Sequence, residues 1–263
     1  MRLLLTNDDG IEAEGLALLE SVARRFSDDV WVVAPASNQS SCGRAITQTR
    51  KVACDQLGDQ RYAIGGTPGD CAIIALNGLI PGKRPDVVLS GVNRGSNLGE
   101  DIALSGTVGA CLQAWEQGVS AIAFSQVLAN FTARPTNWQG AEAFLEQTLQ
   151  RFLKIALDEP GVLNVNFPPL DDVANYRGTV LAAPGIRLLP LSVKSEVDAT
   201  GQCWYDYRSL RNKREVSENS DIDLAYRGHI TVSPLTHTLH HDARVGKLES
   251  IMTTDTTASE NRE

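Results

Sequence analysis

The chain has 263 residues, of which 42% are hydrophobic and 21% are charged, and its formal net charge is −8. This is the composition of a folded globular protein with room for one large α/β domain, or for one domain with a smaller appendage. A negative surface argues against non-specific nucleic-acid binding, which needs a basic face, so we expect no nucleic-acid partner. Small phosphorylated ligands remain compatible with this charge, because a bound metal ion reverses its local sign.

The positions of the cysteines and the first residues of the chain help to predict its cellular compartment. The five cysteines, at positions 42, 54, 71, 111 and 203, are odd in number and form no C-x-x-C pair. A disulfide framework and a zinc site are therefore disfavoured, and a reducing cytoplasm is the simplest location. The apolar run at the start ends at Thr6 before two aspartates, which leaves it too short for a signal peptide. No run of about 18 apolar residues exists, so we expect no membrane span.

Short apolar runs alternate with amphipathic segments over the first two thirds of the chain. The pattern predicts strands at 3–6, 29–36, 61–65, 85–91, 121–125 and 162–167, and helices at 14–26, 70–79, 106–117 and 139–157. Strands that alternate with helices imply crossover connections, and hence a mainly parallel sheet covered on both faces. Sheets of this kind bind ligands beyond the carboxyl ends of their strands.

The character of the chain changes near residue 170. Residues 171–218 are polar and loop-rich, with short strands expected at 179–183 and 203–207, and a later strand is expected at 229–235. We therefore predict an αβα core over 1–170, a β-rich extension over 171–252 whose last strand returns to the core, and a disordered tail over 253–263.

Four polar or glycine-rich segments each follow a predicted strand or open a predicted helix. They are TNDDG (6–10), APASNQSSCG (34–43), LSGVNRGSNLG (89–99) and LSGTVGA (104–110). In a parallel sheet the carboxyl ends of the strands share one edge, so we expect these segments to meet there.

Asp8 and Asp9 are the first candidates for chemistry. A lone Asp-Gly after a strand is usually a turn or a helix cap, but adjacent carboxylates raise each other's pKa unless a cation lies between them. The polar groups expected at this edge, Asp8, Asp9, Ser40 and Asn93, offer only oxygen. Such donors suit Mg²⁺, Mn²⁺ or Ca²⁺ rather than zinc.

The other segments suggest a phosphate site. Ser105, Gly106 and Thr107 open a predicted helix, where backbone N–H groups and two hydroxyls either cap the helix or hold a phosphate. The glycines and asparagines of 91–99, Asn97 among them, permit tight turns that direct amide groups at a ligand. All four histidines, at 229, 237, 240 and 241, lie near the end of the chain. A carboxylate is therefore the expected proton acceptor, and the sequence does not choose between Asp8 and Asp9.

The order and spacing of five motifs resemble the SurE family of stationary-phase survival proteins, which are metal-dependent nucleotidases. The motifs are LLLTNDDGI, VVAPASNQSSCGRAIT, GGTPGDCAIIAL, PDVVLSGVNRGSNLGEDIALSGTVGA and SDIDLAYRGHITVSPLT. They cover most of residues 1–127 and 220–236. The resemblance implies a three-layer, Rossmann-like αβα fold with a carboxyl-terminal extension, containing a hairpin, that assembles homodimers or homotetramers.

The resemblance also implies an activity and a site. Asp8, Asp9, Ser40 and Asn93 correspond to the family's ligands for one divalent metal per subunit, Mg²⁺ or Mn²⁺, with Asp8 and Asp9 also catalytic. Ser105, Gly106 and Thr107 match its phosphate loop, and Asn97 is assigned to the substrate with them. The implied enzyme is a 5'-nucleotidase that hydrolyses nucleoside 5'- and 3'-monophosphates.

Other functions fit parts of the same pattern. One alternative is a phosphatase for short polyphosphate or another small phosphomonoester, and another is a non-catalytic nucleotide-binding protein. A Mg²⁺-binding receiver domain also carries paired acids after its first strand. It is disfavoured because it is usually about half this length and needs an acceptor aspartate after a middle strand, whereas Asp86 precedes its strand.

Overall fold

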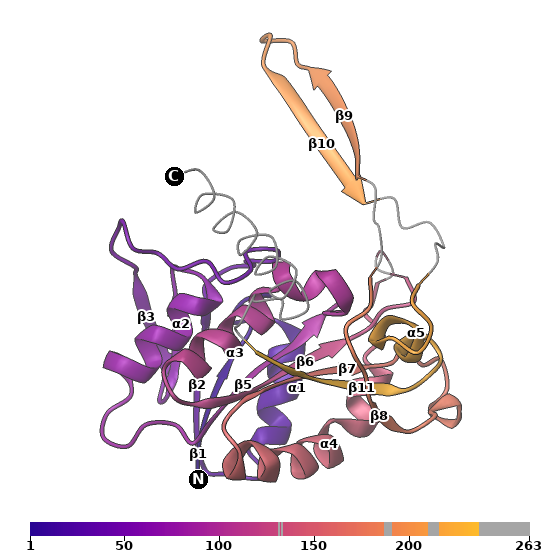
Figure 1. The fold of residues 1–263 in the computed structure, drawn as a ribbon. Helices are drawn as coiled ribbons and strands as arrows, with labels where there is room; N and C mark the ends of the chain where they lie inside the picture. Colours follow the sequence, from indigo (N-terminus) through magenta and orange to yellow (C-terminus); the bar gives the residue numbers. More distant parts are fainter. Residues whose placement is uncertain (131, 133, 187–190, 210–215, 237–263) are drawn as a thin grey trace, which may run out of the picture.

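A computed structural model describes residues 1–130, 132, 134–186, 191–209 and 216–236. Its main feature is a nine-stranded sheet in the order β3-β4-β2-β1-β5-β6-β7-β11-β8. Six neighbouring strands, from β4 to β7, run parallel, while β3 and β11 are antiparallel to β4 and β7 respectively. The predicted α/β class with a mainly parallel sheet is confirmed (Figure 1).

The strands of this sheet are β1 Arg2–Thr6, β2 Asp29–Pro35, β3 Cys54–Gly58, β4 Arg61–Ile64, β5 Val87–Arg94, β6 Ser120–Gln126, β7 Val162–Phe167, β8 Thr179–Leu181 and β11 Ile230–Leu235. The α-helices are α1 Glu14–Ala23, α2 Pro68–Ile74, α3 Gly106–Glu116, α4 Gln139–Asp158 and α5 Asp221–Tyr226. Shorter turns are a π-helix, η1 Ala75–Leu79, and two 3₁₀ helices, η2 Gly99–Leu104 and η3 Val173–Asn175.

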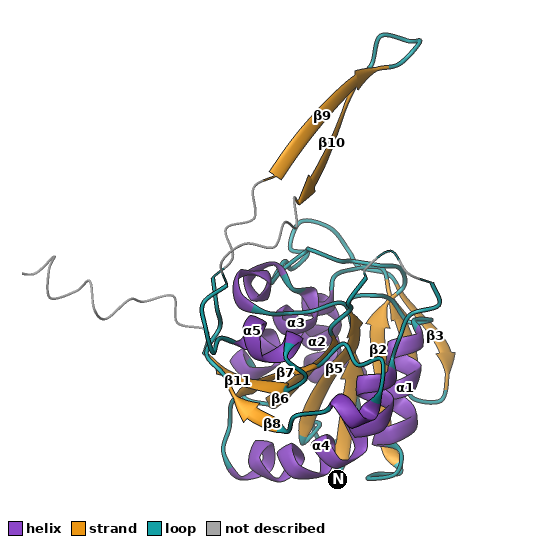
Figure 2. Ribbon diagram, turned by 90° about the vertical axis from the view of Figure 1, so that its right-hand side faces the viewer, coloured by secondary structure: helices purple, strands orange, loops and turns teal. Residues whose placement is uncertain are grey.

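Two apolar cores lie on opposite faces of the sheet, because successive strand side chains point to opposite sides. In β1, Leu3 and Leu5 belong to the core shared with α1 and α4, whereas Leu4 belongs to the core shared with α2 and α3. Figure 2 shows the helices on the two sides of the strands. This explains why the strands read as continuous apolar runs, since both of their faces are buried.

The chain reverses its direction of travel across the sheet between β1 and β5. From β1 it proceeds outward to β2 and β4, then returns to place β5 on the other side of β1 and continues to β6 and β7. In open α/β sheets the crevice at such a switch point, outside the carboxyl ends of the strands, is where ligands bind. The residues that follow β1 and β5 therefore occupy the favoured place for a site.

The carboxyl-terminal part contributes to two different structures. Strands β8 and β11 join the main sheet, whereas β9 Leu191–Val197 and β10 Cys203–Ser209 pair only with each other. This antiparallel hairpin projects away from the αβα body (Figure 1). The predicted tail over 253–263 lies outside the described residues, as do His237, His240 and His241.

Several elements differ from the expectation. The segment predicted as a helix over 70–79 is helical throughout, but α2 ends at Ile74 and gives way to a π-helical turn that contains Asn77 and Gly78, two poor helix formers. Strand β3 was not predicted, because all five of its residues are exposed and show no alternation. Helix α5 spans only six residues, too few to show a helical period. Among the helices described, none combines the length and the hydropathy needed to cross a bilayer.

Candidate functional site

Asp8 and Asp9 lie just beyond the carboxyl end of β1, at the switch point of the sheet. A turn fixes them there: the Asn7 side chain donates to the Gly10 carbonyl at 2.8 Å and accepts from the Gly10 amide at 3.2 Å. Gly10 has a φ of +108°, a backbone conformation that glycine adopts without strain. The local sequence thus holds two neighbouring carboxyl groups at the edge of the sheet.

The electrostatic state of these two carboxyl groups is unusual. The pKa of Asp8 is raised to about 6, mainly by burial; a hydrogen bond from Thr107 opposes the rise and the neighbouring Asp9 adds to it. Burial also raises the pKa of Asp9 to about 6. Both groups are therefore costly to ionise in the folded protein, and a bound cation would remove that cost.

The loop after β2 reaches this pair through its backbone and one side chain. The Gln39 amide donates to the Asp8 carbonyl at 2.7 Å, and the Asn38 side-chain amide lies 3.5 Å from Oδ1 of Asp9. Oδ1 of Asn38 in turn accepts from the Ser40 amide at 2.9 Å, so the position of Ser40 is tied to that of Asp9. Ser40 is solvent-exposed, which leaves its hydroxyl accessible to a ligand.

The end of β5 approaches Asp9 from the other side. The backbone amide of Arg94 donates to Oδ2 of Asp9 at 2.9 Å. The neighbouring Asn93 uses its amide nitrogen on the Gly95 carbonyl at 3.0 Å, so the oxygen Oδ1 is what it can offer to a cation. This end of β5 is the one that the switch point brings beside β1.

The start of α3 completes the cluster. The Thr107 hydroxyl donates to Oδ1 of Asp8, and the Ser105 hydroxyl caps the helix by accepting from the Val108 amide at 3.0 Å. Between them Gly106 packs against Asp8 so closely that a Cβ there would lie 2.7 Å from the Asp8 Cβ and 2.9 Å from its Oδ2. The helix start and the acidic pair thus form one compact unit.

Asn97 lies deeper than the rest and is only 5% exposed. Its side-chain amide donates to the Ser125 hydroxyl at 2.8 Å, its backbone amide donates to Asn166, and its carbonyl accepts from Asn164 and Asn166. These bonds anchor the loop after β5 to β6 and β7. A direct contact of Asn97 with substrate stays a prediction.

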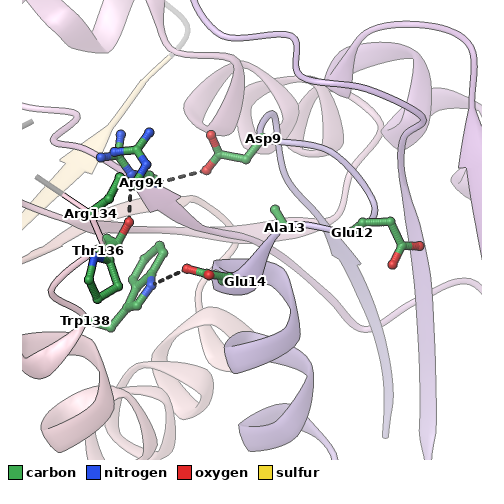
Figure 3. Close-up of a pocket in the computed structure, with 10 residues that line it drawn as sticks. Asp9, Glu12, Ala13, Glu14, Arg94, Arg134, Thr136 and Trp138 are labelled. Carbon is green, nitrogen blue, oxygen red and sulfur yellow. Dashed lines mark hydrogen bonds between the residues drawn. The ribbon is translucent and has the colours of Figure 1, made fainter. Parts of the chain in front are cut away.

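A cavity of about 300 Å³ adjoins Asp9, and no sequence pattern pointed to it. Figure 3 shows Arg94, Arg134, Trp138 and Glu14 around it, contributed by β5, the segment before α4 and the start of α1. Arg94 lies inside the LSGVNRGSNLG motif, but no local signal marks Arg134 or Trp138. Their nearness to Asp9 depends on the path of the segment before α4, which sets Trp138 against Glu14 at the start of α1.

The donors of the cluster fit a hard divalent cation better than zinc or another metal that prefers nitrogen and sulfur ligands. In the described part of the chain, no three or more His, Cys, Asp or Glu side chains are grouped so as to hold a metal. The candidate set instead combines the carboxylates of Asp8 and Asp9 with the Ser40 hydroxyl and the Asn93 amide oxygen, which suits Mg²⁺ or Mn²⁺. His229, which directly precedes β11, is the one histidine that the structure describes.

The fold and the clustered residues define a doubly wound α/β protein with an acidic, oxygen-rich site at the switch point of its sheet. The sequence profile of the family described as "Survival protein SurE" matches residues 3–187. The chain belongs to the SurE family.

Individual relatives agree with this membership. The chain is 39% identical to the 5'-nucleotidase SurE of Caulobacter vibrioides, with 96% of each chain covered. It is 36% identical to the protein of the same name from Paramagnetospirillum magneticum, with 95% of each covered. The crystal structure of the SurE protein from Aquifex aeolicus superposes with a TM-score of 0.79 at 28% identity, covering 96% of this chain and 100% of that one.

Proposed function

We propose that this chain is a divalent-metal-dependent 5'-nucleotidase that hydrolyses nucleoside monophosphates to nucleoside and phosphate. The observation that carries the proposal is the pair of buried Asp8 and partly buried Asp9, with both pKa values raised to about 6, beside a helix start that bears hydroxyl groups. The relatives named 5'-nucleotidase SurE, similar over nearly the full chain, support the same activity.

We assign one Mg²⁺ or Mn²⁺ to Asp8, Asp9, Ser40 and Asn93. When bound, such an ion supplies positive charge that neutralises phosphoryl oxygens and lowers the pKa of water. The Thr107 hydroxyl holds Oδ1 of Asp8 and so fixes the orientation of that carboxylate. Because Gly106 has no side chain, the helix start stays in contact with Asp8, and a helix N-terminus is a favourable place for a phosphate.

We assign the role of general base, which accepts the proton of the attacking water, to Asp8 or Asp9. A base with a pKa near 6 is largely ionised at neutral pH and well matched to proton transfer. Their pKa values do not distinguish Asp8 from Asp9 as the base, because both are about 6. The carboxylate that holds the metal more weakly is the better candidate for the base, and the variants Asp8→Asn and Asp9→Asn distinguish the two residues.

The direct test is phosphate release from a panel of substrates with Mn²⁺, Mg²⁺ or excess EDTA. We expect 5'-monophosphates to be hydrolysed with either ion, 3'-monophosphates more slowly, and EDTA to abolish the activity because phosphoryl charge is then left without its cation. Equal activity with EDTA would contradict the proposal. Preferential release from tripolyphosphate would favour the polyphosphatase alternative.

Metal affinity is expected to depend on pH through the two raised pKa values. Below about pH 6 protons compete with the cation for Asp8 and Asp9, so the Kd for Mn²⁺ should rise by at least about tenfold between pH 7 and pH 5. The contribution of these two carboxyl groups to the stability of the metal-free fold has the opposite sign: it is fully present below the unfolded pKa of 3.8 and is lost as pH rises through about 6. Calorimetric titration at pH 5, 6 and 7 measures the first effect, and a Kd that is constant across this range would contradict it.

Assembly and location are further parts of the proposal. The hairpin of β9 and β10 exposes large apolar side chains, including Val193 and Val197 on one strand and Trp204 and Tyr205 on the other. Such a surface supports a homodimer or homotetramer in which the hairpin is covered. Five cysteines, all reduced in the structure, are compatible with the cytoplasm.

A further inference from the structure

Two of the side chains that line the cavity beside Asp9 are held in place by hydrogen bonds. The Arg94 side chain is held by a hydrogen bond from its Nε to the Thr136 hydroxyl at 2.8 Å, while its backbone amide binds Asp9 at 2.9 Å. Trp138 is half-buried against the core, and its indole N–H donates to Glu14 at 3.1 Å. Arg94 and Trp138 are therefore held in place before any ligand arrives, which lowers the entropic cost of binding.

Gly15 makes the approach of the indole possible. A Cβ at this position would lie 1.9 Å from the Val92 carbonyl oxygen and 2.9 Å from the Cη2 atom of Trp138. The start of α1 therefore packs directly under β5 and against the aromatic ring. The ring is held at the edge of the cavity by contacts that no larger residue would allow.

The charges around the cavity are balanced. The guanidinium groups of Arg94 and Arg134 lie on one side, and the carboxylates of Asp9 and Glu14 lie across from them (Figure 3). The Glu12 carboxylate points away from this group in the same view. A phosphate group in this cavity would be repelled by the carboxylates of Asp9 and Glu14. A neutral ligand with a flat ring and several polar edges could instead interact with groups of both charges.

We infer that this cavity receives the nucleoside part of the substrate, with the base packed on Trp138 and its polar edges met by Arg94, Arg134 and Glu14. The inference rests on the proposed 5'-nucleotidase activity and adds a specificity site to it. A volume of about 300 Å³ is in the range of pockets for small ligands. Because Asp9 lines this cavity and is also assigned to the metal, a phosphate held beside Asp9 places its ester group at the mouth of the cavity.

The test compares 5'-AMP with methyl phosphate, a phosphomonoester that has no nucleoside. Loss of the stack between a base and an aromatic ring weakens binding by about tenfold. The ratio of kcat/KM for 5'-AMP to kcat/KM for methyl phosphate should therefore fall about tenfold in Trp138→Leu and severalfold in Arg134→Ala. Trp138→Phe keeps a ring and should retain most of the ratio. Arg151→Ala, an exposed arginine on α4, is the matched control and should leave the ratio unchanged.

The outcomes separate the inference from the proposed function. A wild-type protein that hydrolyses 5'-AMP, with an unchanged ratio in both Trp138→Leu and Arg134→Ala, would overturn the inference and leave the function intact. A greater loss for tripolyphosphate than for 5'-AMP would also overturn it, in favour of an anion subsite. If the wild type hydrolyses neither ester, the proposed function fails. In that case an NMR titration with adenosine decides whether the nucleoside site exists. The indole N–H resonance of Trp138 is the one missing from the spectrum of Trp138→Phe, and adenosine should shift it.

Discussion

Asp8→Asn is expected to lower kcat/KM for nucleoside monophosphates by roughly a thousandfold, the magnitude typical for loss of a charged group from such a centre. Asp8 is only 4% exposed, accepts the Thr107 hydroxyl and packs against Gly106, so its carboxylate is the most confined of the proposed metal ligands. The substitution keeps the shape of the side chain but removes its charge. The Kd for Mn²⁺, measured by calorimetry, should rise together with the loss of activity.

The same variant should be more stable than the wild type when metal is absent. The pKa of Asp8 is raised from 3.8 to about 6, so its ionised form destabilises the metal-free fold at pH 8 by up to about 3 kcal/mol. The asparagine side chain carries no such charge, and urea unfolding in EDTA should show the gain. Asp28→Asn, at an exposed position, is the control and should change neither activity nor stability. An Asp8→Asn protein that is unstable as well as inactive would point to a structural role instead.

Asp9→Asn extends this experiment to the choice of proton acceptor. Oδ2 of Asp9 accepts the Arg94 amide, and the asparagine can keep that bond through its oxygen. If Asp9 is the base, the variant should bind Mn²⁺ within a few-fold of the wild type yet lose the acidic limb of its pH–rate profile. If Asp9 is mainly a ligand, affinity and activity should fall together. Full activity with normal metal affinity would remove Asp9 from the site.

Gly106→Ala is expected to reduce kcat/KM by about a hundredfold, although it adds only a methyl group. The new Cβ would lie 2.7 Å from the Asp8 Cβ, 2.9 Å from its Oδ2 and 3.0 Å from the Cys42 sulfur. Either the Asp8 side chain or the start of α3 has to move, and both belong to the proposed site. Steady-state kinetics and a Mn²⁺ titration should show a higher Kd as well as a lower kcat.

Gly78→Ala is the matched control for this substitution, because a Cβ at Gly78 meets no atom within 4 Å. We expect it to behave as the wild type in activity and metal binding. Adding Cys42→Ala to Gly106→Ala relieves only the contact with sulfur, so the double variant should stay impaired. Recovery in the double variant would show that Cys42, rather than Asp8, is the group that limits this position.

Much of the fold could be read from the sequence because its signals are local. The runs that became β1, β2, β6 and β7 are apolar over most of their length, and their alternation with amphipathic segments indicates a parallel sheet covered on both faces. Elements without such a signal were missed: β3 is exposed throughout, and α5 is held by a cap at Ser220 and by packing on β11. Short or exposed elements derive their structure from partners that are distant in sequence.

For the site, the local sequence specified which residue types were available: adjacent carboxylates after a strand, oxygen donors after other strands, and hydroxyls at a helix start. How these groups meet depended on the packing of the whole domain. The strand order placed β5 beside β1, so that the Arg94 amide reaches Asp9, and the start of α3 set the Thr107 hydroxyl on Asp8. The path of the chain before α4 brought Trp138 and Arg134 to the far side of Asp9. Contacts of this kind join residues as far as 124 positions apart, and no pattern of neighbouring residues encodes them, because they depend on strand order and helix packing.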